Sequence, residues 1–375
     1  MSAGRPAIDV VEKNPYLPQP FVFSEVAVCL RDSIRAAGYA SEHLVNRIDP
    51  AAYSIILGGT PELLRDLPGA DPMRCAIFNF EQLGSSSNIA TPEYRRWLSD
   101  WLVLDYHSSN VEFLKRENGP NQLAFELPLV PSENLVVGGD EAKTVDVLFF
   151  GTMSERRARV LVDLEALGLK VEVVAGAYGS ELAPAIRRAK LVLHIHYYES
   201  ALFPIARFVQ PVMMGVPIVC ETSVFSEHGD WSHSGIVFAD YAHLAETCHE
   251  LIDSPERMAR RAQMAREFVH HIDFAAPFEP VVRAFEGLPT RARVVVPDEP
   301  RVSRDGAHDG EEAPLTDEEI EAILAAEGGL PPDGAHVQPF KLVERTPGQG
   351  RYGMWVVVLL LVFSFYTIWV SMTQR

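Results

Sequence analysis

The chain has 375 residues, 47% of them hydrophobic, which is enough length and apolar content to bury the cores of two domains. Its formal net charge of −18 argues against a nucleic-acid partner, because phosphate backbones are bound by basic surfaces. The four cysteines form no CxxC pair and no zinc spacing, which favours reduced thiols in a reducing compartment over a disulfide scaffold.

The amino-terminal part of the chain predicts a loose end followed by a small α/β domain. Residues 1–20 are rich in proline, and we expect them to be flexible. Residues 21–135 alternate short apolar runs with amphipathic segments, beginning with a helix that Ser24 is expected to cap. The predicted strands are Leu44–Asn46, Ser54–Leu57, Cys75–Phe80, Trp101–Asp105 and Phe125–Val130, and the predicted helices are Ser24–Ala37, Glu93–Leu98 and Ser108–Arg116.

A second α/β domain is predicted over residues 144–288, after a polar hinge at 132–143. Its strands are expected at Val145–Phe150, Leu169–Ala175, Leu191–His196, Val216–Glu221 and Gly235–Phe238. Its helices are expected at Glu155–Leu167, Glu181–Ala189, Phe203–Met214, Leu244–Ile252 and Pro255–Val269, with Ser154 as the first cap. Phe274–Leu288 is expected to return and pack on the first domain. Alternating strands and helices predict two Rossmann-like domains with parallel sheets.

The composition changes after residue 288. Residues 289–352 are acidic and rich in Gly and Pro, which predicts a disordered linker, with one short amphipathic helix at Leu315–Ala326. Residues 353–372 are uncharged and almost wholly apolar, which predicts one transmembrane helix. More basic residues precede this span than follow it, so we expect the globular domains in the cytoplasm, at a bacterial inner membrane.

The chain lacks the short motifs of several enzyme classes. No Walker A pattern, GxSxG or HExxH occurs, and no GxGxxG occurs within residues 21–288, which weakens kinase, dehydrogenase, esterase and zinc-protease interpretations. No DxD pattern occurs either, so we expect no essential metal and no cofactor. Parallel sheets bind ligands beyond the carboxyl ends of their strands, where two unusual loops occur here, at residues 151–157 and 196–200.

Two α/β domains joined by a hinge resemble the GT-B fold of glycosyltransferases. Within residues 145–221, Gly151 follows the first strand of the second domain as in the retaining, nucleotide-sugar-dependent group. Glu199 begins a segment that resembles the group's acidic donor-binding motif, although its second glutamate is replaced by Arg207 or Gln210, depending on the count. Phe78–Leu83, Asp105–Asn110 and His196–Glu199 resemble a bacterial subgroup with a His-Tyr-Tyr-Glu motif.

The resemblance implies a donor site built from Gly151, Arg156, Glu199 and Arg207. Glycine allows close backbone approach, a helix start and arginines neutralise a diphosphate, and a carboxylate accepts hydrogen bonds from sugar hydroxyls. Arg157 is a weaker candidate for the same role.

Two further groups are candidates for the chemistry itself. His194 and His196 share one face of a strand; His196 is the catalytic candidate, although the pattern does not decide which of the two reaches a ligand. Glu81 follows a strand of the first domain and is the candidate base for an acceptor hydroxyl.

The predicted function is therefore a membrane-tethered glycosyltransferase whose partners are a nucleotide-sugar and a glycan, lipid-linked or protein acceptor. The tether favours acceptors at the cytoplasmic face, such as an envelope glycan precursor. The missing second glutamate keeps a different interpretation open, a non-catalytic GT-B-like scaffold whose tail docks a partner at the membrane.

Overall fold

The computed structural model describes residues 5–15, 17, 21–83, 90–119, 121–136, 141–197, 202–222, 231 and 233–288. The chain divides into two compact units, Met1–Thr290 and Arg291–Arg375, and all of these residues belong to the first. The predicted linker, its short helix and the predicted membrane span therefore lie outside the described residues. Among the helices that are described, none combines the length and the apolar character needed to cross a membrane.

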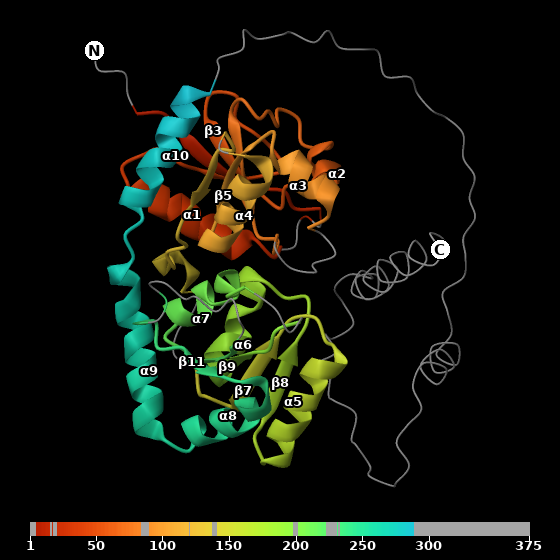
Figure 1. Ribbon diagram of the computed structural model, residues 1–375. Helices are drawn as coiled ribbons and strands as arrows, with labels where there is room; N and C mark the ends of the chain where they lie inside the picture. Colours follow the sequence, from red (N-terminus) through yellow and green to blue (C-terminus); the bar gives the residue numbers. More distant parts are fainter. Residues whose placement is uncertain are drawn as a thin grey trace, which may run out of the picture. The chain divides into compact units, whose positions relative to one another are not determined.

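A six-stranded parallel sheet in the order β2-β1-β3-β4-β5-β6 forms the amino-terminal domain, which is coloured red to orange in Figure 1. Its strands are β1 (Ile8–Glu12), β2 (His43–Val45), β3 (Tyr53–Leu57), β4 (Cys75–Asn79), β5 (Leu102–Asp105) and β6 (Ala124–Glu126). Its helices are α1 (Ser24–Ala36), α2 (Pro61–Leu64), α3 (Pro92–Leu98) and α4 (Ser108–Asn118). A short 3₁₀ helix, η1 (Glu133–Leu135), follows.

A five-stranded parallel sheet in the order β11-β10-β9-β7-β8 forms the second domain. Its strands are β7 (Val145–Phe150), β8 (Val171–Val174), β9 (Ala189–His194), β10 (Ile218–Glu221) and β11 (Val237–Ala239). Its helices are α5 (Glu155–Ala166), α6 (Ala183–Arg188), α7 (Val209–Met213), α8 (Leu244–Ile252) and α9 (Pro255–Phe268). The 3₁₀ helices η2 (Gly179–Glu181), η3 (Ile205–Arg207), η5 (Tyr241–His243) and η6 (Val269–His271) complete it.

Each sheet is covered on both faces, because alternate strand residues enter different apolar clusters. In the first sheet, Ile55 and Leu57 pack with α1, whereas Ile56 packs with α3 and α4. In the second, Val147 and Phe149 pack with α5 and α8, whereas Leu148 packs with α6 and α7. This layering confirms the predicted α/β fold with parallel sheets.

The expectation that residues 1–20 are flexible is wrong for Ile8–Glu12, which form β1 between two other strands of the sheet. The strand is buried along its whole length despite two acidic residues. The Asp9 carboxylate accepts the Glu42 N–H at 2.9 Å, and Glu12 accepts from Ser24 Oγ at 2.8 Å and contacts His43 Nε2 at 2.9 Å. These long-range partners explain why a strand with charged residues is buried, and the local pattern does not reveal them.

Two helix starts also differ from the prediction. Ser24 does not cap α1 from outside; it is the first helical residue, and its hydroxyl bonds Glu12 instead. The predicted helix Phe203–Met214 is divided into η3 and the short α7, with prolines at 204 and 211, since a proline has no N–H to donate to a helix. By contrast, β7, α8 and the Ser154 cap of α5 match the prediction.

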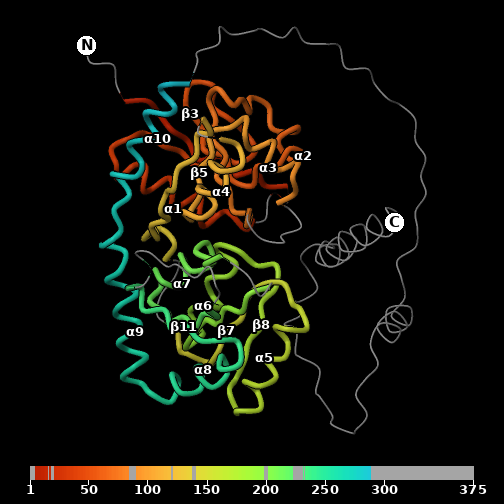
Figure 2. The backbone as a smooth tube through the Cα atoms, in the orientation of Figure 1, coloured from red at the N-terminus to blue at the C-terminus, as the bar shows by residue number. Residues whose placement is uncertain are grey.

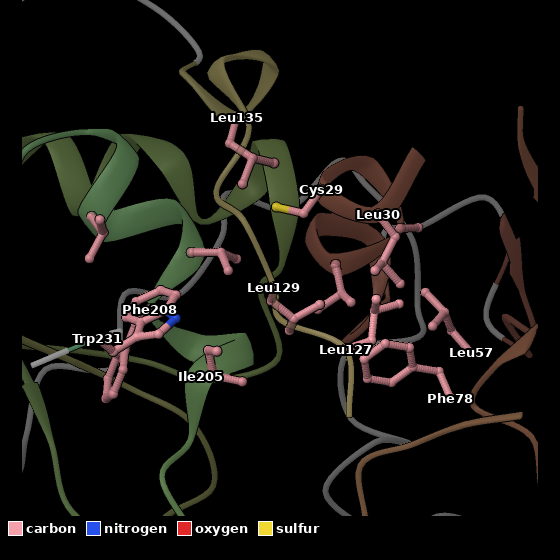
Figure 3. Packing of buried hydrophobic residues seen from close by; sticks show 14 of the residues in the cluster. Cys29, Leu30, Leu57, Phe78, Leu127, Leu129, Leu135, Ile205, Phe208 and Trp231 are labelled. Carbon is pink, nitrogen blue, oxygen red and sulfur yellow. The ribbon is translucent and has the colours of Figure 1, made fainter. Parts of the chain in front are cut away.

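The carboxyl ends of the two sheets face each other. Ser24 at the start of α1 contacts the end of β1, and the next residue, Glu25, accepts a hydrogen bond from the Gly179 N–H. Gly179 is the first residue of η2, which follows the carboxyl end of β8. A continuous apolar cluster joins the domains behind this contact, from Leu57 of β3 through Leu127 to Phe208 (Figure 3). A ligand between the strand ends would therefore contact both domains.

Helix α10 (Ala275–Gly287) carries the chain from α9 back to the first domain, as the tube in Figure 2 shows. The Phe285 ring stacks on Tyr53 of β3 at 5.0 Å between centroids, and Phe278 meets Tyr39 edge to face at 5.6 Å. The predicted return of Phe274–Leu288 onto the first domain is confirmed.

Candidate functional site

Gly151 and Arg207, two of the predicted donor-site residues, are in contact at the carboxyl end of β7. Gly151 has φ +132°, and a Cβ added to it would lie 2.7 Å from Arg207 Nη1. The guanidinium thus occupies the space that any other side chain would fill, and it donates from Nη1 to the Phe150 carbonyl at 3.0 Å. Glycine is required here both for its backbone conformation and for this close approach.

Arg157 approaches the same strand end from the opposite layer. It lies on α5 and is 3% exposed; its Nε donates to the Ile195 carbonyl at 3.0 Å. Burial and, to a smaller extent, the nearby Arg207 charge lower the pKa of Arg157 to about 10. Sequence reasoning ranked Arg157 below Arg156. The helical pattern carried the signal, because Arg157 precedes Val160, Leu161 and Leu164 on the buried face of α5.

The two arginines carry charge that no described carboxylate neutralises. Among the described residues, neither Arg157 nor Arg207 has an acidic side chain within ion-pair distance, and their hydrogen bonds go to backbone carbonyls. Burial also lowers the pKa of Arg207. Guanidinium groups stay protonated near neutral pH, so two like charges are kept close together in a partly desolvated place. An anionic ligand would offset both the repulsion between the two guanidinium groups and the free-energy cost of desolvating them.

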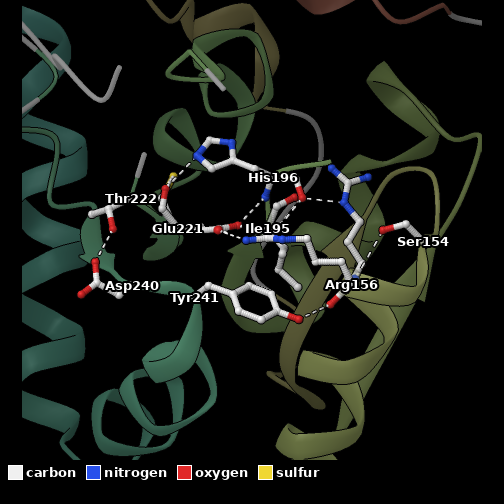
Figure 4. A network of polar contacts seen from close by, with 10 residues as sticks. Ser154, Arg156, Ile195, His196, Glu221, Thr222, Asp240 and Tyr241 are labelled. Atoms are coloured by element: carbon white, nitrogen blue, oxygen red, sulfur yellow. Dashed lines mark hydrogen bonds and ion pairs between the residues drawn. The ribbon is translucent and has the colours of Figure 1, made fainter. Parts of the chain in front are cut away.

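Arg156, another predicted donor-site residue, is already paired with a carboxylate. Its guanidinium forms a two-pronged ion pair with Glu221, the last residue of β10, and lies 3.9 Å over the ring of Tyr241 (Figure 4). Glu221 is 3% exposed and also accepts the His196 N–H at 2.8 Å. Because Glu221 offsets the Arg156 charge, Arg207 and Arg157 hold the positive charge left for a ligand.

Sequence reasoning did not single out Glu221. The available signal was an acidic residue at the end of an otherwise apolar strand, in the same predicted sheet as the strands that precede the loops at 151–157 and 196–200. The structure shows that this carboxylate links α5, the loop after β9 and β10. Glu221 therefore fixes the wall of the site.

An open cleft of about 500 Å³ adjoins this ion pair. It lies between Arg156 and Arg159 of α5 and the residues Thr222, Asp240 and Tyr241 that follow β10 and β11. Its volume is within the usual range for small-molecule sites. The hydroxyl of Thr222 donates to Asp240, another lining residue, at 2.7 Å (Figure 4).

The two predicted histidines lie side by side, with ring centroids 5.1 Å apart. His196 Nε2 contacts the Glu221 carbonyl at 2.9 Å, so that nitrogen is engaged. His194 is 6% exposed, and its Nε2 has no hydrogen-bond partner among the described residues. Burial lowers the pKa of both rings, and the nearby arginines add to this, so both are neutral at pH 7. His194 Nε2 therefore has unused hydrogen-bonding capacity beside the cationic pair.

Glu81 lies just past the carboxyl end of β4 in the first domain. Burial alone raises the pKa of its carboxyl to about 7. Its carboxylate has no hydrogen-bond partner among the described residues, whereas its backbone is held on both sides by Asn79 and Asn110. A carboxyl with these properties can exchange a proton near neutral pH.

Some predicted features cannot be placed. Glu199 and the preceding Tyr198 of the His-Tyr-Tyr-Glu segment lie outside the described residues. Within the described part of the chain, no group of three or more His, Cys, Asp or Glu residues is arranged to hold a metal ion.

No protein-family model matches the chain. Two curated relatives are uncharacterized proteins of Acanthamoeba polyphaga mimivirus. L138 is 29% identical over 141 residues, which are 36% of this chain and 16% of that protein. L140 is 24% identical over 193 residues, which are 48% of this chain and 59% of that protein. The matches thus span less than two thirds of each relative's own length.

Solved structures also resemble the chain. An α-glucosyltransferase bound to UDP and a 13-mer DNA containing an HMU base is 9% identical, with a TM-score of 0.51, over 75% of this chain and all of that one. This likeness shows a GT-B-like fold. HepE of Anabaena, bound to UDP and glucose, is 11% identical, with a TM-score of 0.49, over 76% of this chain and all of that one. The likeness to the α-glucosyltransferase confirms the predicted GT-B-like α/β fold of the two domains, while the bacterial subgroup stays a prediction.

Proposed function

We propose that the protein is a glycosyltransferase that uses a nucleoside-diphosphate sugar as donor. The observation that carries the proposal is the pair Arg157 and Arg207, held at the carboxyl end of β7 without an ion pair to any described carboxylate. The GT-B-like fold supports it, because the solved neighbour with this fold is a glucosyltransferase that binds UDP. The class of reaction is inferred from the site and the fold together.

In this proposal the diphosphate lies against Arg207, Arg157 and the backbone at Gly151. The nucleoside enters the 500 Å³ cleft beside Arg156 and Tyr241. The bond between the anomeric carbon and the phosphate oxygen breaks, and the diphosphate leaves with the electron pair. Charge that develops on that oxygen is stabilised by guanidinium groups already in place, which need not reorganise during the reaction.

Glu81 supplies the base. An acceptor oxygen forms the new bond to the anomeric carbon, and its proton passes to the Glu81 carboxylate. Glu81 lies at the strand ends of the first domain, which face those of the second, so the acceptor approaches from the amino-terminal domain. His196, whose Nε2 contacts the Glu221 carbonyl, orients the wall of the donor site.

A screen of nucleotides by thermal unfolding of the full-length chain tests the donor proposal. We expect UDP or another nucleoside diphosphate at about 100 times its Kd to stabilise the protein by about 2.7 kcal/mol, and the matching nucleoside without phosphates to do much less. Inorganic pyrophosphate separates phosphate binding from base recognition. If no nucleotide, sugar nucleotide or pyrophosphate raises Tm, the glycosyltransferase proposal is wrong and the interpretation as a non-catalytic scaffold takes its place.

We also propose that the tail at 353–372 anchors the protein, so that the acceptor is a glycan, lipid-linked or protein substrate at the cytoplasmic face of the membrane. The support is the uncharged apolar run in the sequence. A chain lacking residues 353–375 is expected to move from the membrane pellet to the supernatant in sedimentation of cell extracts. If the shortened chain still sediments with membranes after a carbonate wash, the tail is not the anchor.

A further inference from the structure

The proposed base, Glu81, is fixed through its backbone by two asparagine side chains. Asn79 Nδ2 and Asn110 Nδ2 each donate to the Glu81 carbonyl at 2.9 Å. The Glu81 N–H in turn donates to Asn79 Oδ1 at 3.2 Å. Because Glu81 lies in a loop, these bonds replace the support that a strand or helix would give.

Both asparagines are held by one carboxylate. Asp105 Oδ2 accepts from Asn79 Nδ2 at 2.6 Å and from Asn110 Nδ2 at 2.9 Å. Asp105 Oδ1 accepts the His107 N–H at 2.9 Å. Asp105 is fully buried at the end of β5 and pairs with Asn79 across the sheet. The side chains thus form a closed clamp of one acid and two amides.

The orientation of each amide is determined by its other partners. Asn79 Oδ1 accepts from the Glu81 N–H at 3.2 Å and from the Tyr94 hydroxyl at 2.9 Å, and Asn110 Oδ1 accepts from the Leu83 N–H at 3.1 Å. A backbone N–H can only donate, so neither amide can be flipped, and both NH₂ groups must point to Asp105 and the Glu81 carbonyl.

A buried carboxyl is a costly way to stabilise a domain, since burial disfavours its charged form. Asp105 is tolerated because three donors converge on it. A fully apolar side chain at the end of β5 would avoid the cost of burial, but it would leave both amide groups without their acceptor. The arrangement is therefore suited to holding Glu81 rather than to adding stability.

We propose that Asp105 is a positioning residue that fixes the Glu81 carboxyl toward the acceptor through Asn79 and Asn110; this rests on the proposed function. Replacing Asp105 by asparagine keeps its shape but places an NH₂ group against other donors. The clamp then opens, the Glu81 loop moves, and water reaches its carboxyl. The ionisable groups that face Glu81 are Asp105 and Tyr106 of the β5 end and Tyr94 of α3.

The test combines a titration with a rate measurement on the full-length chain. Carboxyl-carbon NMR of glutamate-labelled protein, assigned with Glu81→Gln, is expected to show Glu81 of the wild type titrating near 7. In Asp105→Asn we expect the midpoint to fall toward the usual glutamate value of about 4.3. We also expect kcat for UDP-glucose hydrolysis to fall about tenfold, with Kd for UDP unchanged.

Gln122→Ala is the matched control, because it also removes a buried amide from the first domain, one whose Nε2 donates to the Trp101 carbonyl at 3.1 Å. It is expected to lower Tm without changing the Glu81 titration. Asn110→Ala, which removes one arm of the clamp, should give an intermediate shift and serves if Asp105→Asn does not fold. An unchanged Glu81 midpoint in both clamp variants, or an equal shift in Gln122→Ala, overturns the proposal. Failure of the wild type to bind any nucleoside diphosphate would instead contradict the donor site, since the Glu81 titration does not depend on nucleotide binding.

Discussion

Replacing Arg207 by methionine is expected to weaken the binding of UDP by about 10- to 150-fold, the equivalent of roughly 1.5–3 kcal/mol for hydrogen bonds to a charged group. Methionine keeps most of the apolar stem of arginine and removes only the guanidinium that contacts Gly151 and the Phe150 carbonyl. Because this substitution also relieves the repulsion on Arg157, we expect stability to be unchanged or increased. Isothermal titration calorimetry of the full-length chain measures the affinity, and thermal unfolding measures the stability.

Two comparisons make this result specific. Uridine lacks phosphates, so its affinity is expected to be equal in the wild type and Arg207→Met. Arg257→Ala removes an exposed arginine of α9 whose partner is Glu250, and it should leave UDP binding as it is. Equal UDP affinities in the wild type and Arg207→Met would show that the guanidinium does not contact the diphosphate, and the donor site would have to lie elsewhere.

The fold of the second domain was predictable because its strands are local apolar runs. Val145–Phe150 is one such run, and Ser154 caps the following helix as the sequence indicated. The strand Ile8–Glu12 was not predictable in the same way, since Asp9 and Glu12 interrupt its apolar pattern. Their partners, Glu42 and His43, are about thirty residues away along the chain, and only the folded protein brings them together.

Candidate residues could be chosen from the sequence where the local backbone requires one residue type. They could not be chosen where a residue's role depends on a contact with a distant segment of the chain. Gly151 was chosen because a glycine at a strand end allows close approach of a ligand, and in the structure the group that approaches it closely is the Arg207 guanidinium. The choice between Arg156 and Arg157 depended on Glu221, which lies on another strand. The ion pair with Glu221 offsets the Arg156 charge, whereas burial without an acid leaves Arg157 charged. Such pairings are properties of the tertiary structure.

Glu81→Gln is expected to lower kcat for sugar transfer by about 10²- to 10⁴-fold, the usual contribution of a general base. The sign of the pH dependence follows from the direction of the shift. Burial raises the pKa of Glu81 to about 7, so the basic form is lost as the pH falls below that value. The wild-type rate should therefore rise as the pH increases through about 7. The pH–rate profile of Glu81→Gln should lack this rising limb. UDP affinity is expected to be unchanged, because Glu81 belongs to the other domain.

The pH profile also separates Glu81 from its buried neighbour. Burial raises the pKa of Asp105 to about 7 as well, so either carboxyl alone would account for a limb in that range. A limb that persists in Glu81→Gln would therefore assign the titration to Asp105 and remove Glu81 as the base. Glu112→Gln, an exposed acid on α4 of the same domain, is the matched control and should keep the wild-type rate and profile. Loss of the limb in Glu81→Gln alone, with UDP binding intact, would place proton transfer on the first domain and leaving-group stabilisation on the second, as the facing strand ends require.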